Sequence, residues 1–386
     1  MKAIHQLSTF QNILKQYSQN EPLHRFLATY YRQNKQMGSK DRRTASRLIY
    51  NYFRLGKALV NEPIEERLIV AEFLCNTETN DFIAHFKPNW NQLVPLPLKE
   101  KINLVKAEYP DFNLADVFPF QNYISDKVDQ EAFYQSFFIQ PDLFIRMQRG
   151  QDNRIINQLK VADIKFTQVG PQTLAFTNST NLDQVLTDKG IYEVQDLSSQ
   201  KACTYFKPQK WDKWWDCCAA SGGKSLYLHD EEPTVKLLVS DNRASILENL
   251  KERFSLARIT NYQRKVLDLT LNQALFLHDY EFDGIILDAP CSGSGTWGRT
   301  PEMITQTEEY KIKFYTELQR KIALNVVKYL KVGKPLIYIT CSVFKAENEE
   351  QVEWLCKQFN LVVESQELIT GYNYKADTLF VARLIK

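Results

Sequence analysis

The spacing of apolar residues predicts that the first third of the chain is helical. Apolar side chains recur at the three- and four-residue intervals of an amphipathic helix, first over residues 23–31 and then over 48–53. Gly38 breaks the pattern between these runs, and Ser39 is predicted to cap the second helix. Helical spacing then continues with one proline-bearing interruption. We therefore expect an all-helical domain over residues 1–135.

Beyond Pro141 the pattern changes from helical to mixed. Short apolar runs that are typical of strands surround a single helical run, and Gly170-Pro171 marks a turn between two of them. The predicted strands are residues 143–147, 166–169 and 173–176, and the predicted helix is 153–159. We therefore expect a small α+β module, of the RRM or ferredoxin-like kind, over residues 140–200.

From about residue 211 strand-like runs alternate with helical ones. Such alternation indicates a mostly parallel sheet with helices on both faces. The predicted strands are residues 214–217, 235–240, 264–267, 284–287 and 335–339, and the longer predicted helices are 243–257 and 308–330. We expect an α/β, Rossmann-like domain over residues 201–386. In this architecture ligands lie beyond the carboxyl ends of the strands, so strand-end residues become the candidates for function.

Composition narrows the class of protein. The 386 residues are 44% hydrophobic and 24% charged, as in an ordinary soluble domain. The N-terminus lacks the apolar stretch of a signal peptide, and no apolar run reaches the roughly 18 residues of a membrane span. The seven cysteines are odd in number and form no C-x-x-C pair, which argues against disulfides and zinc. We expect a cytoplasmic, monomeric protein without metal or membrane contact.

Charge is distributed unevenly along the chain. Residues 1–60 carry a net charge of +9, whereas the whole chain carries only +2. Clustered basic residues are the usual contact for phosphate backbones, so this segment predicts RNA binding, with Arg42, Arg43 and Arg47 as candidates. The alternative that charge alone leaves open is a solvated helix face.

The ends of the first three strands of the Rossmann-like domain carry candidate ligand-binding residues. A run of small residues follows the first strand: Cys218, Ala219, Ala220, Ser221, Gly222, Gly223 and Lys224. This run is not a phosphate loop, because that motif requires glycine where Cys218 stands. Asp241 and Asp268 end the next two strands, where a carboxylate suits ribose hydroxyls, although an aspartate there is also a common helix cap. The run of small residues and the two aspartates together fit an adenosine-bearing ligand. This ligand would lack phosphates, because the carboxylates of Asp216 and Asp288 would repel them.

Cysteines follow the fourth and fifth strands. Cys291 lies in the stretch Asp288-Ala289-Pro290-Cys291-Ser292-Gly293-Ser294-Gly295-Thr296, and Cys341 lies between Thr340 and Ser342. A single free cysteine is often a buried packing residue. Two cysteines at the ends of neighbouring strands would face the same crevice, and this arrangement favours a role in catalysis. The residues alone do not decide which thiol would attack a substrate.

These motifs resemble those of the Nop/Sun (RsmB-like) family of RNA 5-methylcytosine methyltransferases. The stretch around Cys291, continued by Arg299 and Pro301-Glu302, resembles the family's fourth motif, and Tyr338 to Ser342 with Glu347-Asn348-Glu349 resembles its sixth. Residues 218–224 are similar to its first motif, residues 192–200 to the segment that enters the catalytic domain, and residues 380–382 to its closing strand. The resemblance covers residues 140 to 386, and the basic N-terminus resembles the RNA-binding domains of bacterial members more loosely.

The resemblance implies a class I methyltransferase domain that takes its methyl group from S-adenosylmethionine. It implies Cys341 as nucleophile, Cys291 as the residue that assists product release, and Asp288 and Lys224 beside the target base. The cofactor would be held by residues 218–224 together with Asp241, Asp268 and Asp288. Ribosomal RNA is the expected substrate and transfer RNA the alternative.

Several positions depart from the family pattern without removing a reacting group. Ser221 replaces a proline, Ile246 an arginine, Gly333-Lys334 a glycine pair, and residues 376–380 a glycine-containing run. Two rival functions stay open at this point. One is DNA cytosine methylation, in which the Pro-Cys cysteine attacks and no Thr-Cys partner is expected. The other is a non-catalytic RNA-binding or assembly factor on the same fold.

Overall fold

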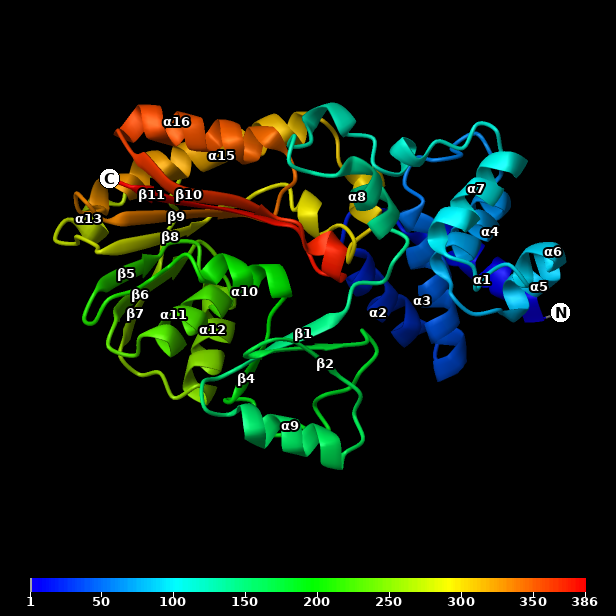
Figure 1. Ribbon diagram of the computed structural model, residues 1–386, viewed down its shortest axis with the longest axis horizontal. Coiled ribbons are helices and arrows are strands. Elements are labelled where there is room, and N and C mark those ends of the chain that lie inside the picture. The colour runs from blue at the N-terminus through cyan, green and yellow to red at the C-terminus, as the bar shows by residue number, and fades with distance from the viewer. Residues whose placement is uncertain (1) are drawn as a thin grey trace. The chain divides into compact units, whose positions relative to one another are not determined.

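The computed structural model describes residues 2–386 and divides the chain into two compact units (Figure 1). The helical unit comprises the chain up to Asn122 together with residues 129–140 and 296–308. The sheet unit comprises residues 123–128, 141–295 and 309–386.

The helical unit is built from amphipathic helices around an aromatic-rich core. Its helices are α1 (Lys2–Gln16), α2 (Leu23–Gln33), α3 (Ser39–Arg54), α4 (Ile64–Cys75), α5 (Asp81–Phe86), α6 (Pro88–Asn91), α7 (Leu98–Glu108), α8 (Gln130–Ser136) and α14 (Glu302–Gln306). Phe10, Leu27 and Leu48 are among the side chains buried between them. The predicted helical character is confirmed, but Ser39 is the first helical residue and Gly38 occupies the cap position.

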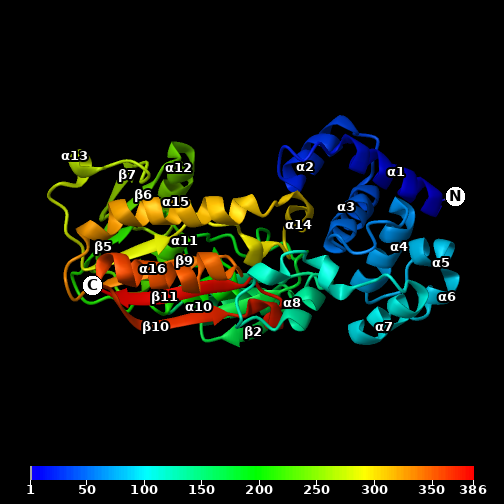
Figure 2. The same ribbon diagram turned by 90° about the horizontal axis from the view of Figure 1, so that it is seen from above.

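Residues 296–308 belong to the helical unit although they follow the Cys291 stretch in sequence. Helix α14 lies beside α3, as Figure 2 shows. The Trp297 ring lies 5.4 Å from the ring of Phe118, centroid to centroid, and the backbone N–H of Leu23 donates to Glu302 Oε1 at 3.2 Å. The helical unit therefore contains part of a motif that the sequence places in the Rossmann-like region.

The sheet unit begins with a four-stranded antiparallel sheet. Its strands are β1 (Leu143–Met147), β2 (Thr167–Gly170), β3 (Thr173–Phe176) and β4 (Tyr192–Val194), in the order β2-β3-β1-β4. Helix α9 (Asp152–Val161) packs on this sheet through Ile155 and Leu159. The strand order is that of a ferredoxin-like module, but turns and loop replace the second helix between residues 177 and 191. The boundaries predicted near residues 135, 140 and 200 stay predictions.

The larger sheet has seven strands in the order β10-β11-β9-β8-β5-β6-β7. Strands β5 (Lys213–Asp216), β6 (Lys236–Asp241), β7 (Tyr262–Val266), β8 (Gly284–Asp288) and β9 (Pro335–Thr340) pair in parallel, whereas β11 (Leu379–Ile385) is antiparallel to β9 and to β10 (Val362–Ile369). The predicted Rossmann-like, mostly parallel sheet is thus confirmed.

Helices cover both faces of the larger sheet (Figure 1). One face carries α10 (Leu197–Cys203), α11 (Gly223–Glu231) and α12 (Ala244–Leu256), and the other carries α15 (Tyr310–Val326) and α16 (Glu349–Phe359). Short helix α13 (Ala274–Leu277) follows β7. The central strands are almost continuously apolar, for example Ile285, Ile286 and Leu287 in β8, because they are buried on both sides.

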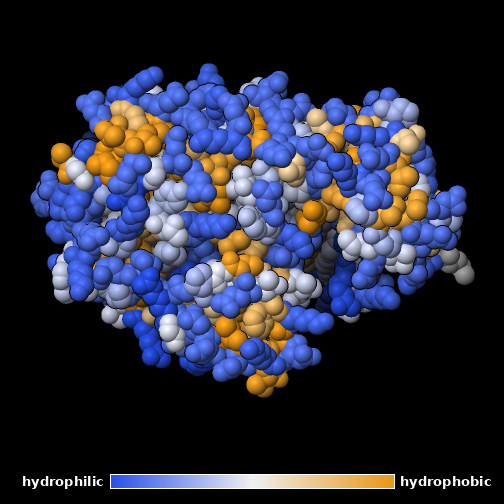
Figure 3. Space-filling view, in the orientation of Figure 1, coloured by the Kyte–Doolittle hydropathy of each residue, from blue (hydrophilic) through white to orange (hydrophobic). Residues whose placement is uncertain are grey.

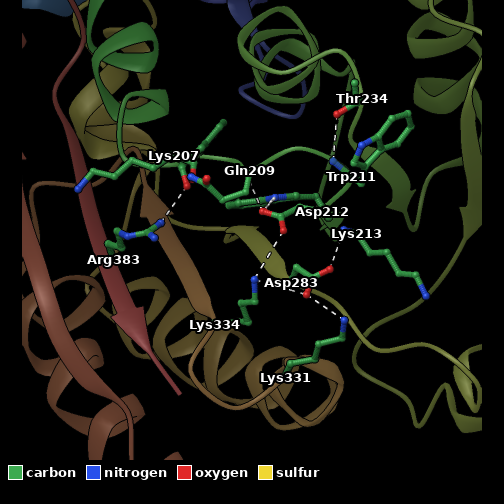
Figure 4. A network of polar contacts seen from close by, with 12 residues as sticks. Lys207, Gln209, Trp211, Asp212, Lys213, Thr234, Asp283, Lys331, Lys334 and Arg383 are labelled. Carbon is green, nitrogen blue, oxygen red and sulfur yellow. Dashed lines mark hydrogen bonds and ion pairs between the residues drawn. The ribbon is translucent and has the colours of Figure 1, made fainter.

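Charged residues join the strands at the amino edge of the larger sheet (Figure 4). Asp283 accepts a hydrogen bond from the backbone N–H of Lys213 at 3.0 Å and pairs with Lys331 at 2.9 Å. Lys334 lies 3.6 Å from both Asp283 and Asp212. Burial works against ionisation of Asp283, but these donors hold the pKa of its carboxyl below the ordinary value. The network ties together the segments that enter β5, β8 and β9 at this edge of the sheet.

The surface seen in Figure 3 is mainly hydrophilic, with apolar side chains in separate patches. Within residues 2–386, no helix combines the length and apolar character that crossing a membrane requires.

Candidate active site

The two strand-end cysteines lie side by side. Cys291 follows β8 and Cys341 follows β9, and because these strands are parallel neighbours the two Sγ atoms are 3.3 Å apart. Both side chains are only partly buried. The hydrogen bond with Cys341, together with burial, raises the pKa of Cys291 well above the ordinary value for a thiol. The predicted crevice between the fourth and fifth strands is therefore present, and Cys291 keeps its proton there.

A buried carboxylate holds the loop that carries Cys291. Glu347 Oε1 accepts the backbone N–H of Ser292 at 2.9 Å, and Oε2 accepts the Ser292 hydroxyl at 2.6 Å. Gln319, from α15, donates to Glu347 at 3.2 Å and to the carbonyl of Pro290 at 3.1 Å. The β8 and β9 loops are thus fixed to each other through groups excluded from water.

Close backbone packing fixes the far end of the same loop. The N–H of Gly295 donates to the Cys341 carbonyl at 2.9 Å, and the Gly295 carbonyl accepts from Thr378 at 2.8 Å. A Cβ at residue 295 would lie 2.0 Å from the Thr378 carbonyl oxygen, so only glycine fits. The end of the loop is therefore held in place by the backbone of residues 341 and 378.

Asp288, three residues before Cys291, forms an ion pair with Lys224. Lys224 Nζ lies 2.6 Å from Asp288 Oδ2, and the two side chains are 13% and 31% exposed. Burial alone would lower the pKa of Lys224, but the Asp288 carboxylate outweighs it and raises that pKa. Lys224 therefore carries its charge at neutral pH, and Asp288 is its hydrogen-bond acceptor at the end of β8.

The run of small residues after β5 forms a tight turn into α11. The N–H of Ala219 donates to the Ser240 carbonyl at 2.9 Å, and the N–H of Ala220 donates to Asp241 Oδ2 at 3.1 Å. Gly222 has φ +84°, and a Cβ there would lie 2.9 Å from Leu250 and Phe254. Ser221 accepts from Arg253 at 2.7 Å through its hydroxyl. Cys218 and Ala220 face the cavity described next, whereas Gly222 packs behind it.

A cavity of about 610 Å³ joins these strand ends. Its lining includes seven of the predicted site residues, namely Cys218, Ala220, Asp241, Asp268, Asp288, Cys291 and Cys341. Asp241 also binds Arg243 Nε at 3.0 Å, and Asp268 accepts the Thr270 hydroxyl at 2.7 Å. Hydrogen bonds from Thr270 lower the pKa of Asp268. In the part of the chain that the structure describes, no three His, Cys, Asp or Glu side chains could hold a metal ion.

Asp216 lies beneath the turn. It is 1% exposed, accepts the Ser225 hydroxyl at 2.6 Å through Oδ2, and its Oδ1 has no hydrogen-bond partner. Burial raises its pKa to about 7. An acid that is partly protonated near neutral pH can donate a hydrogen bond as well as accept one.

Comparison with known proteins agrees with this geometry. Residues 203–382 match the family model described as 16S rRNA methyltransferase RsmB/F. This segment is therefore similar to the methyltransferase domain of the RsmB/F family. Methyltransferases of this family depend on S-adenosylmethionine.

Curated relatives of the RsmB/F-type domain carry one name. "Ribosomal RNA small subunit methyltransferase B" of Shewanella oneidensis is 34% identical over 209 residues, which are 51% of this chain and 48% of the relative. Its namesake from Photorhabdus laumondii is 32% identical over 171 residues, 44% of this chain and 39% of the relative. The chain thus spans about half the length of the curated relatives it matches, or less.

Solved structures share the fold at low sequence identity. The protein PH0851 has a TM-score of 0.71 at 19% identity and covers 95% of both chains. NSun6 from Pyrococcus horikoshii, solved with SFG, has a TM-score of 0.59 at 16% identity and covers 67% of this chain and 95% of its own. These similarities confirm the Rossmann-like methyltransferase fold.

The charged residues that line the cavity of the RsmB/F-type domain suit S-adenosylmethionine. Carboxylates at the ends of β6 and β8 and after β7 suit hydroxyl groups and a positively charged sulfonium, and they disfavour phosphates. The orphaned Oδ1 of Asp216 adds a further unpaired polar atom beneath the turn.

Several residues of the site were missed by sequence reasoning. Asn242 and Arg243 directly follow Asp241 and line the cavity, so their position could have identified them. Tyr315, Leu318 and Ile322 also line it from α15, but nothing in the spacing of that helix distinguishes a cavity-lining face from a packed one. Glu347 was noted only as part of a motif.

The three candidate RNA-binding arginines lie on α3, within the helical unit. Arg47 pairs with the buried Glu72 at 3.0 Å, and Arg42 donates to the Met37 carbonyl at 2.9 Å. Arg43 is exposed. Arg47 and Arg42 thus have structural partners, and Arg43 presents the most accessible charge of the three.

Proposed function

We propose that this protein transfers the methyl group of S-adenosylmethionine to C5 of a cytosine in RNA, with ribosomal RNA as its substrate. The observation that carries the proposal is the thiol pair, Cys291 and Cys341, with Sγ atoms 3.3 Å apart at the edge of a cavity that also contains Asp288. A cytosine needs one thiol to activate C6 and a second group to complete the release of product.

Cys341 is the nucleophile in this proposal. The two Sγ atoms lie 3.3 Å apart, so a protonated Cys291 can donate to Cys341 and stabilise its thiolate. The Cys341 thiolate adds to C6, which makes C5 nucleophilic enough to take the methyl group. After transfer a water molecule accepts the C5 proton and the electron pair of that C–H bond forms the C5=C6 double bond. The C6–S bond breaks at the same time, and its electron pair returns to Cys341 as the thiolate. Cys291 lies where it assists this last step.

In this proposal Asp288 binds the cytosine through a hydrogen bond and does not protonate it. Its Oδ2 pairs with Lys224 at 2.6 Å, and a carboxylate oxygen suits the N4 amino group as a hydrogen-bond acceptor. Lys224 supplies a positive charge that offsets the negative charge gathering on the ring during thiolate addition.

Residues after β5, β6 and β7 would hold the cofactor, which supplies an electrophilic methyl group when bound. Cys218 and Ala220 would flank its methionine portion, and Asp241 would accept from the ribose hydroxyls. Asp268, which lines the same cavity, would bind the adenine end. The remaining residues of the turn, Ala219, Ser221, Gly222 and Gly223, act by shaping it.

The basic helical region supports an RNA substrate. Residues 1–60 carry a net charge of +9, and phosphate backbones are bound chiefly by such clusters. The curated relatives are named for ribosomal RNA of the small subunit, which favours ribosomal over transfer RNA. We expect the protein to act as a monomer in the cytoplasm.

The first experiment replaces each cysteine by alanine and incubates the purified protein with cellular RNA and labelled cofactor. Cys341→Ala should abolish both methyl transfer and covalent adduct. Cys291→Ala should lower turnover by about 10²–10⁴-fold and accumulate a protein–RNA adduct that survives a denaturing gel. An adduct in the Cys341 variant but not in the Cys291 variant would reverse the two roles.

Bisulfite sequencing of cellular RNA with and without the protein identifies the substrate. Loss of one protected cytosine in small-subunit ribosomal RNA is the expected result. A lost site in transfer RNA would select the alternative substrate. RNA binding with no lost site and no methyl transfer in vitro would instead favour the non-catalytic factor.

A further inference from the structure

Helix α15 crosses the cavity from its cofactor end to its thiol end. Near its C-terminus, Asn325 donates to the Leu269 carbonyl at 3.0 Å, which ties it to the loop that carries Asp268. Further toward its N-terminus, Gln319 donates to the Pro290 carbonyl next to Cys291. The first turns of α15 therefore continue beyond the contact with Pro290, which directly precedes Cys291. Figure 2 shows α15 running alongside the larger sheet.

Near the N-terminus of α15, the face that lines the cavity lies next to a face that is exposed to solvent. Tyr315, Leu318 and Ile322 line the cavity, and their spacing extends one turn earlier to Lys311. Beside this face lie Tyr310 and Phe314, one turn apart, with 64% and 56% of their surface exposed. The two rings thus form an exposed aromatic pair directly beside the cavity-lining face, and Phe314 contacts Tyr315 of that face with ring centroids 5.3 Å apart.

Lysines interleave with these aromatic residues. The sequence from 310 to 315 reads Tyr-Lys-Ile-Lys-Phe-Tyr, and the Lys313 side chain is 83% exposed. A protein partner is disfavoured, because lysine is depleted at the centre of protein interfaces. Aromatic rings among cations are the usual surface for unpaired nucleotides, since bases stack on the rings and phosphates meet the charges.

We propose that Tyr310, Phe314 and the lysines beside them form a stacking platform for unpaired nucleotides that flank the target cytosine. This inference rests on the proposed function and adds that the substrate is single-stranded at the site. A base inside a duplex must leave its stack to reach a pocket, and a platform at the pocket mouth holds the displaced neighbours. We name the exposed pair Tyr310 and Phe314 the α15 platform.

The test measures binding of a short unstructured oligoribonucleotide that has one central cytosine and 2-aminopurine beside it. Stacking on a ring quenches 2-aminopurine fluorescence, so one titration reports both affinity and contact. Wild-type protein should quench the probe. Phe314→Ala and Tyr310→Ala should each raise Kd about tenfold and lose quenching. Phe314→Trp should restore both.

Trp211 provides the matched control. Its side chain is 66% exposed, but it lies at the amino edge of the larger sheet, as Figure 4 shows. Trp211→Ala should leave Kd and quenching unchanged. Equal affinity in the Phe314→Ala, Tyr310→Ala and wild-type proteins would overturn the platform, as would failure of the wild type to bind the probe.

The two proposals fail in different ways. If the probe is quenched through the α15 platform but no RNA is methylated, the platform stands and the proposed reaction is wrong. If RNA is methylated while the platform variants bind and react like wild type, the reaction stands and the platform is wrong.

Discussion

At the scale of single residues, the chemistry of the site depends on the protonation state of each side chain. Cys291 keeps its proton, Lys224 keeps its positive charge, and Asp288 is the carboxylate that pairs with it. Each state follows from burial combined with one specific partner. The sequence supplied these residue types, but their protonation follows only from the distances between them.

Asp216 yields a pH-dependent prediction. Burial raises its pKa to about 7, above the value of about 4 in the unfolded chain. The folded state therefore favours the protonated acid. The stability that this group contributes is complete below pH 4 and is lost as pH rises through about 7. Asp216→Asn, which cannot ionise, should remove this loss.

Urea unfolding between pH 5 and 8 measures the effect. Over this range the free energy of unfolding of the wild type should fall relative to that of Asp216→Asn by on the order of a few kcal/mol. Parallel pH profiles for the two proteins would show that Asp216 remains ionised in the folded state. Ser225→Ala serves as a control, because it removes the hydrogen bond to Asp216 but leaves the acid in place.

At the scale of elements, the turn after β5 carries the second prediction. Gly222 adopts φ +84°, and a Cβ would lie 2.9 Å from Leu250 and Phe254. Gly222→Ala should therefore destabilise the fold by about 1–3 kcal/mol and weaken cofactor binding, because the turn must move. Calorimetric titration with S-adenosylmethionine and thermal unfolding would measure both.

The neighbouring glycine is a matched control for this turn. A Cβ at Gly223 would meet nothing closer than 3.8 Å, and α11 begins there. Gly223→Ala should leave stability near that of the wild type. If Gly222→Ala and Gly223→Ala change stability equally, the left-handed backbone at residue 222 is not what requires glycine there.

Most of the Rossmann-like domain was predictable because its strands are buried and its helices amphipathic. Strand β10 was missed because its pattern is mostly exposed, with only Leu368 and Ile369 buried, which resembles a loop. Strand β4 was missed because three residues give too short a period to recognise. The strand-end residues were found because parallel strands place their carboxyl ends together, whereas the cavity face of α15 depends on tertiary packing.

At the scale of the whole molecule, one chain segment belongs to a different unit from the one that its position in the sequence suggests. Residues 296–308 directly follow the loop that carries Cys291, yet their packing partners are in the helical unit. Leu23 contacts Glu302, and Phe118 contacts Trp297. The helical unit therefore contributes to the order of a segment that begins one residue after Gly295.

The last prediction tests this contribution with two buried rings of the helical unit. Phe118→Leu removes a contact of Trp297, whereas Phe73→Leu removes a ring that packs on Trp90 instead. Both should lower the free energy of unfolding by roughly 0.5–3 kcal/mol. Only Phe118→Leu should speed hydrogen exchange in residues 296–308 and reduce methyl transfer, because the segment after the Cys291 loop loses its support. Hydrogen exchange followed by mass spectrometry measures the segment directly, and equal protection of residues 296–308 in both variants would contradict the prediction.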